Sequence, residues 1–168
     1  IKNIIKKYKR LDKIQWNICK TSLKLEEGMP HTHGRIIYLS ELFFNLSKTK
    51  QINTLIHEKI HVYQRMYRDK TYKLYKSLGF KRHNFKSKMI RSNPDNDKYV
   101  YSYKGKLFYK KYKKLPKSLY DTYTLNKDIF NDKNYKQTEH PNEIFASTLP
   151  ELMMKNKMKD KKLIEYFN

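Results

Sequence analysis

The chain has a single cysteine, Cys19, among its 168 residues. One thiol cannot form an internal disulfide, so a small secreted fold held together by disulfides is excluded. A lone free cysteine fits a reducing compartment. We therefore expect an intracellular protein of the cytoplasm or nucleus, or one packaged in a virion.

The chain also lacks long apolar runs. No stretch approaches the roughly 18 consecutive apolar residues that suggest a membrane span. The first six residues lack the apolar core and the small-residue cleavage site of a secretory signal. No internal repeat or low-complexity linker divides the sequence, and its length suits one domain with its own core. We expect no membrane partner and a single domain over residues 1–168.

Acidic residues are scarce. The 38 Lys and Arg residues face only 16 Asp and Glu, which gives a formal net charge of +22. Such an excess is typical of proteins that bind nucleic acid or another acidic partner. Only six of the basic residues are Arg, however, and the chain is rich in Asn, Ile and Tyr, which A/T-rich codons supply. A functional basic surface and a merely solvated one both remain open.

The sequence does contain one short motif that carries chemistry, His57-Glu58-Lys59-Ile60-His61. Histidines four residues apart share one face of an α-helix, so both imidazoles can reach one metal ion. Glu58 lies beside that ion and can handle a proton. This HExxH pattern is typical of zinc metallopeptidases. The alternative is a pair of histidines on an amphipathic helix that form only local hydrogen bonds.

The residues around the motif favour a helix on a core. Apolar residues recur at three-and-four spacing between residues 49 and 67, and Ser47 or Thr49 can cap the start. His57 and His61 lie next to this apolar stripe. A helix that packs on a core would therefore turn both histidines into a partly buried cleft.

The whole pattern predicts an α+β fold, mainly helical, with a small mixed or antiparallel sheet. Helical spacing is also found in residues 4–20, 71–78, 141–149 and 151–167. Pro150 is expected to kink or end the helix over residues 141–149. Residues 99–109 predict a hairpin with Gly105 in its turn. The segments 81–88 and 115–134 show little periodicity and are expected to be irregular.

A short strand is expected just before the motif helix, from Arg35 to Leu39. In zincins such a strand commonly lies at the edge of the sheet, where its free backbone groups align an extended substrate. We therefore predict that Arg35 to Leu39 is a substrate-binding edge strand.

A catalytic zinc takes three protein ligands, and the motif supplies two. The candidates for the third are Glu143, His140, His31, His33 and His83. Glu143 is the best placed, because Pro141 suits the first position of a helix and His140 the cap before it. Glu143 then lies in the first turn and points inward with the apolar residues that follow. His31 and His33 can instead belong to a polar loop before the strand.

Together, the motif and the later run Asn142-Glu143-Ile144-Phe145-Ala146 resemble the gluzincin branch of zinc metallopeptidases. The resemblance implies a zincin-like fold in which His57, His61 and Glu143 bind Zn²⁺ and Glu58 is the general base. Gluzincins often carry an acidic residue four positions after the third ligand, which orients the first histidine. Ser147 occupies that position here, so the orienting group is weaker or comes from elsewhere.

Two further resemblances bear on the family. The runs 30–34, 93–95 and 140–143 resemble uncharacterised zincin-like proteins encoded by large DNA viruses. If His140 were the third ligand, three histidines would hold the metal, which is closer to the SprT-like proteases that act on DNA–protein crosslinks.

We expect a zinc-dependent metallopeptidase that cleaves a peptide or protein substrate, with Glu58 assisting the attack of water. The alternatives are an SprT-like DNA-associated protease and a non-enzymatic basic virion or nucleic-acid-binding protein with a zinc site. Candidates to stabilise the oxyanion are Tyr101, Tyr103 and His83. The segment of Arg91, Asn93 and Asp95 either lines the cleft or forms a structural turn.

Overall fold

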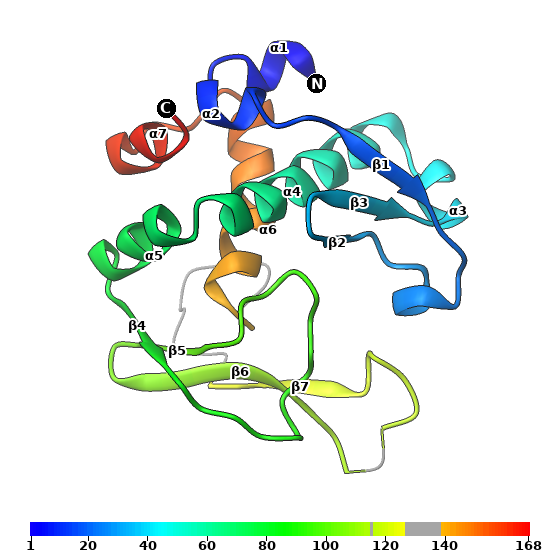
Figure 1. Ribbon diagram of the computed structural model, residues 1–168, viewed down its shortest axis with the longest axis vertical. Helices are drawn as coiled ribbons and strands as arrows, with labels where there is room; N and C mark the ends of the chain where they lie inside the picture. Colours follow the sequence, from blue (N-terminus) through cyan, green and yellow to red (C-terminus); the bar gives the residue numbers. More distant parts are fainter. Residues whose placement is uncertain (115, 127–138) are drawn as a thin grey trace.

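The computed structural model describes residues 1–114, 116–126 and 139–168 of an α+β fold, in which two sheets flank a long central helix (Figure 1). The helices are α1 (Lys2–Ile5), α2 (Lys9–Asp12), the 3₁₀-helix η1 (Leu25–Gly28), α3 (Glu41–Phe44), α4 (Lys48–Met66), α5 (Arg68–Ser77), α6 (Pro141–Met154) and α7 (Lys161–Phe167). The strands are β1 (Asn17–Lys20), β2 (His31–His33), β3 (Ile36–Leu39), β4 (Phe80–His83), β5 (Val100–Tyr103), β6 (Lys106–Tyr112) and β7 (Thr122–Leu125). Across the described ranges, no helix has both the length and the apolar character needed to cross a membrane.

The predicted motif helix is confirmed as α4. It begins after Ser47, whose hydroxyl accepts a hydrogen bond from the Lys50 amide. Its second half is buried almost all round, because α6 crosses it on one side and the small sheet lies on another (Figure 1). The motif therefore lies in the interior of the molecule.

The predicted start of α6 is also confirmed. Pro141 is its first residue, and the Nδ1 atom of His140 accepts a hydrogen bond of 3.0 Å from the Asn142 amide. Pro150 does not end this helix, which continues to Met154. Leu149 and Met153 are buried on either side of the proline, and this packing outweighs the one hydrogen bond that proline cannot donate.

The small sheet corrects the prediction of a substrate-binding edge. Its order is β1-β3-β2, so Arg35 to Leu39 corresponds to the central strand, parallel to β1 and antiparallel to β2. The strand packed near α4 at the edge is β2 instead. The backbone groups of Thr32 in that strand already have hydrogen-bond partners, because the amide donates to Asp95 and the carbonyl accepts from Arg65.

The expectation of one helix over residues 4–20 is wrong. Two short helices, α1 and α2, bury Ile5 and Leu11 of the stripe, while the buried Tyr8 and Ile14 lie outside them, and the chain then continues into strand β1. Ile18 fitted the helical spacing, but its side chain is 50% exposed. The backbone of β1 bonds to β3 in parallel, and this long-range pairing overrides the local helical pattern.

The second sheet is antiparallel in the order β4-β5-β6-β7. The hairpin of β5 and β6 is confirmed, with Lys104 and Gly105 both at positive φ in its turn, as a two-residue type I′ turn requires. The segments expected to be irregular contain β4 and β7. These strands were missed because they form by pairing with β5 and β6, and the segments that contain them show little periodicity of apolar and polar residues. Residues 115 and 127–134 of that expectation lie outside the described residues.

The C-terminal helix α7 is part of the core. Phe167 is fully buried, and its ring packs on those of Tyr8, Tyr63 and Tyr166. The hydroxyl of Tyr63, on α4, donates to the carbonyl of Tyr166. The last helix thus packs on the second half of α4 through Tyr63.

We predict that Phe167→Ala lowers the free energy of unfolding by about 3–5 kcal/mol, because it removes a buried aromatic ring and leaves a cavity. The matched control is Phe44→Ala, whose side chain is 55% exposed and which should cost far less. Urea denaturation followed by circular dichroism measures both. Equal losses in the two variants would contradict the docking of α7.

Candidate metal centre

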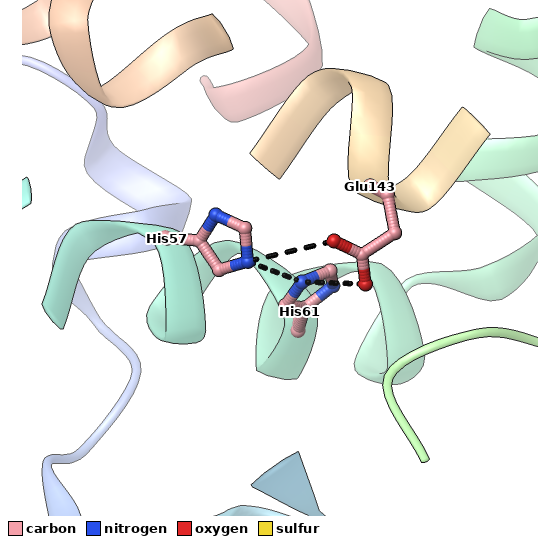
Figure 2. Close-up of side chains that lie close together, drawn as sticks. All are labelled: His57, His61 and Glu143. Carbon is pink, nitrogen blue, oxygen red and sulfur yellow. Dashed lines mark hydrogen bonds and ion pairs between the residues drawn. The ribbon is translucent and has the colours of Figure 1, made fainter. Parts of the chain in front are cut away.

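Two histidines and one glutamate converge between α4 and α6 (Figure 2). The Nε2 atoms of His57 and His61 lie 2.9 Å apart. The Glu143 carboxylate lies 3.5 Å from Nε2 of His61 and 3.7 Å from Nε2 of His57. His61 is fully buried, Glu143 is nearly so, and the side chain of His57 is 21% exposed. The cluster is therefore open to solvent on the His57 side.

The tautomer of His61 is set by Gln64, one turn further along α4. The Gln64 amide nitrogen donates to the carbonyl of Asn142 and to the hydroxyl of Tyr75, each at 3.1 Å. A carbonyl can only accept, so the Gln64 oxygen must face His61, where it lies 3.0 Å from Nδ1. Nδ1 is then the donor, and Nε2 presents its lone pair to the cluster.

Burial shapes the charges of the cluster. Burial lowers the pKa of His57 to about 4, with a further contribution from His61, and it also lowers the pKa of His61. Burial raises the pKa of Glu143 to about 7, against the pull of His57. Neutral imidazoles and a buried carboxyl group thus face one another, an arrangement that a bound cation would stabilise.

The three residues fit a divalent metal such as zinc. Ligand atoms about 2.0–2.2 Å from a tetrahedral zinc ion are roughly 3.4 Å apart. The two Nε2 atoms are 2.9 Å apart, Oε1 of Glu143 lies 3.5 Å from His61 and Oε2 lies 3.7 Å from His57. With one ligand atom taken from each residue, all three atoms lie within 4.8 Å of one another. Two imidazole lone pairs and a carboxylate are also the donors that zinc prefers.

Glu58 faces the cavity beside the cluster. The cavity measures about 410 Å³, and its lining includes His57, Glu58, Glu143, His31 and Tyr120. Glu58 is 3% exposed, and its Oε2 atom has no hydrogen-bond partner among the described residues. Burial, with Asp95 and Glu143 adding repulsion, raises its pKa well above the usual value. An unpartnered buried carboxyl oxygen at a cavity is a candidate proton acceptor or donor.

The segment 91–95 forms one wall of this cavity, and it is also a turn. The Asn93 side-chain oxygen accepts from the Asp95 amide, as in an Asx turn. The Asn93 amide nitrogen donates to Glu143 at 2.9 Å and to Glu139 at 2.6 Å. Arg91, Asn93 and Asp95 all line the cavity. The segment therefore both lines the cavity and forms a structural turn.

The other candidate ligands lie outside the cluster. His140 caps α6 through Nδ1, and its Nε2 atom is 3.2 Å from Asp97. His31 lines the cavity, but its Nδ1 bonds to the Met29 carbonyl and its ring stacks on Tyr38. His33 is exposed on β2, and His83 bonds to Ser102. Of the five candidates, the structure brings only Glu143 to the two histidines.

The proposed oxyanion-stabilising residues lie elsewhere. Tyr101 donates to Asp97, and neither Tyr101, Tyr103 nor His83 lines the cavity, as far as the described residues show. Sequence reasoning also missed Gln64, which orients His61, the second histidine of the motif, whereas Ser147 was considered for the first, His57. The position of Gln64 three residues after His61, on the same helix face, is the signal that could have revealed it.

No family model, curated protein or solved structure matches this chain. The zincin-like fold and the viral resemblance therefore stay predictions that the motifs alone support.

We predict that Gln64→Leu weakens zinc binding by about 10- to 100-fold, because the Nδ1 atom of His61 loses the acceptor that sets its tautomer. Competitive titration against a chromogenic chelator measures this affinity. Gln15→Leu is the matched control, since Gln15 is exposed and away from the cluster. An unchanged affinity in Gln64→Leu would contradict the orienting role.

Proposed function

We propose that this protein is a zinc-dependent metallopeptidase that hydrolyses a peptide bond in a peptide or protein substrate. The observation that carries the proposal is the convergence of His57, His61 and Glu143 beside a cavity that is lined by His57, Glu143 and Glu58. Two histidines and a glutamate are a ligand set of catalytic zinc, which leaves a coordination position for water. A structural metal site would have no use for Glu58 at that position.

The chemistry divides between the metal and Glu58. A zinc ion bound there would lower the pKa of a bound water molecule towards ~7 and polarise the carbonyl of a substrate. Glu58 accepts the proton of the attacking water and later passes it to the leaving amine. Its burial and its unpartnered oxygen suit this role, since no other hydrogen bond holds that oxygen in the described part of the chain.

The substitution Glu58→Gln tests the mechanism. We expect the purified variant to retain about one zinc ion per chain, as the three ligands are unchanged, and to lose at least about 100-fold in hydrolysis rate. Elemental analysis and cleavage of a mixed peptide library measure the two properties. Glu41→Gln, at an exposed position of α3, is the matched control and should keep full activity. Full activity in Glu58→Gln would overturn the mechanism.

Zinc should also stabilise the fold, because its ligands come from α4 and α6, far apart in sequence. We expect zinc at a hundredfold excess over its dissociation constant to raise the free energy of unfolding by about 2.7 kcal/mol. Urea denaturation with zinc and with a chelator measures the difference. His61→Ala should abolish the response, and an equal response in that variant would place the zinc elsewhere.

A further inference from the structure

A second cavity, also of about 410 Å³, adjoins the candidate metal centre. Four residues line both cavities: Arg91, Asn93, Lys110 and Glu139. The remaining lining includes rings and aliphatic groups, such as Phe85, Ile90 and Tyr109. The second cavity therefore combines a polar wall, shared with the metal centre, with apolar sides.

The charges of this second cavity are unbalanced. Among the described residues that line it, Lys86, Arg91, Lys98 and Lys110 are cationic, while Asp97 and Glu139 are the acidic ones. Asp97 is already engaged, since it accepts from Tyr101 and lies 3.2 Å from His140. The cavity thus keeps a positive excess that favours an anionic group.

Glu139 is shared between two cations. Its carboxylate lies 3.3 Å from Nη1 of Arg91 and 3.0 Å from the Lys110 ammonium group. Although burial alone would raise it, the pKa of Glu139 is held below its usual value by Lys110, Asn93 and Arg91. One carboxylate cannot neutralise both cations, so the shared wall itself carries a surplus positive charge.

Arg91 has an unused donor at this wall. Its side chain is 8% exposed, and its Nε atom is buried without a hydrogen-bond partner in the described part of the chain. A guanidinium group binds a carboxylate with two parallel hydrogen bonds, and a buried N–H group without a partner is costly. Arg91 is therefore a built but incomplete site for a carboxylate.

We propose that the Arg91 wall is a specificity site that binds a carboxylate of the substrate, next to the bond that is cleaved. The proposal rests on the proposed peptidase function. Asn93 connects the wall to the metal centre directly, since its amide donates to both Glu139 and Glu143. Arg91 is thus linked to the candidate metal ligand Glu143 through two side chains, Glu139 and Asn93, which suits a site for a residue near the scissile bond. The carboxylate is either an acidic side chain or the C-terminus of the substrate.

The two sources are distinguished with three sets of short N-acetylated peptides. In the first set glutamate is moved through the positions of a peptide amide; in the second, glutamine replaces it; in the third, the glutamine peptides have a free C-terminal carboxylate. We measure kcat/KM with the zinc-loaded protein. We also measure Kd with zinc-loaded Glu58→Gln, which reports binding without hydrolysis. Compared with the amide glutamine set, a carboxylate-bearing set should have a kcat/KM at least about tenfold higher and a Kd at least about tenfold lower.

Substitutions test whether Arg91 is the residue that binds the carboxylate. Arg91→Met should reduce the preference for the carboxylate to near unity, and Arg91→Lys should restore part of it, because it keeps the charge without the second hydrogen bond. If Arg91→Met does not fold, Lys98→Met should still lower the preference, since Lys98 is exposed and lines the second cavity but not the cavity beside the metal centre. Arg35→Met is the matched control, because Arg35 lines neither cavity, and it should keep the full preference.

Each outcome supports or overturns the carboxylate site, the peptidase function or both. A preference for glutamate at one position assigns an acidic side chain, and a preference for the free C-terminus assigns a carboxypeptidase-like substrate; both support the proposal. Glu58-dependent hydrolysis with equal rates and affinities for all three sets overturns the carboxylate site and leaves the peptidase function standing. Arg91-dependent binding of the carboxylate without hydrolysis of any set supports the site and overturns the peptidase function. Neither binding preference nor hydrolysis overturns both.

Discussion

The contact between α4 and α6 is the interaction on which the site depends. Gln64 of α4 bonds to the carbonyl of Asn142 and to Tyr75, whose hydroxyl returns to the side chain of Asn142. These groups are buried, so each lost hydrogen bond would leave a costly unpaired partner. The same network orients His61 and sets the first turn of α6, which holds Glu143. A shift between the helices would therefore disturb the histidine and the glutamate together.

A second network ties the small sheet and the wall segment to the same helix. Arg65, one turn after His61, donates to the Thr32 hydroxyl in β2, to the carbonyl of Gly34 in the turn that follows, and to the carbonyl of Pro94 in the segment 91–95. Asp95 accepts from the backbone and the hydroxyl of Thr32. The guanidinium group of Arg65 thereby connects α4 to the small sheet and to the segment 91–95 that lines the cavity. The cost is a blocked edge of β2 at Thr32, so a substrate that binds as an added strand needs another edge or another part of this one.

Patterns that depend on neighbouring residues were predictable. The three-and-four spacing marked α4, the proline after a capping residue marked the start of α6, and glycine in a tight turn marked the hairpin. Features that depend on distant partners were not. Residues 17–20 became a strand because β3 lies alongside them, and the long helix expected over 4–20 was lost for the same reason. Likewise, the strand at 36–39 was expected, but its central place depends on two partners that local spacing does not reveal.

The sequence by itself determined the chemistry that the site can use: two histidines one turn apart with a glutamate between them, on a helix whose apolar stripe requires burial. Helical geometry alone brings those side chains to one face, so no tertiary information was needed. Only the tertiary structure decided which distant residue joins them. Glu143 and His140 differ by three residues at the same helix start, and their roles separate because capping engages His140 while the packing of α6 on α4 turns Glu143 inward. Packing between elements is a property of the whole chain, and local spacing cannot report it.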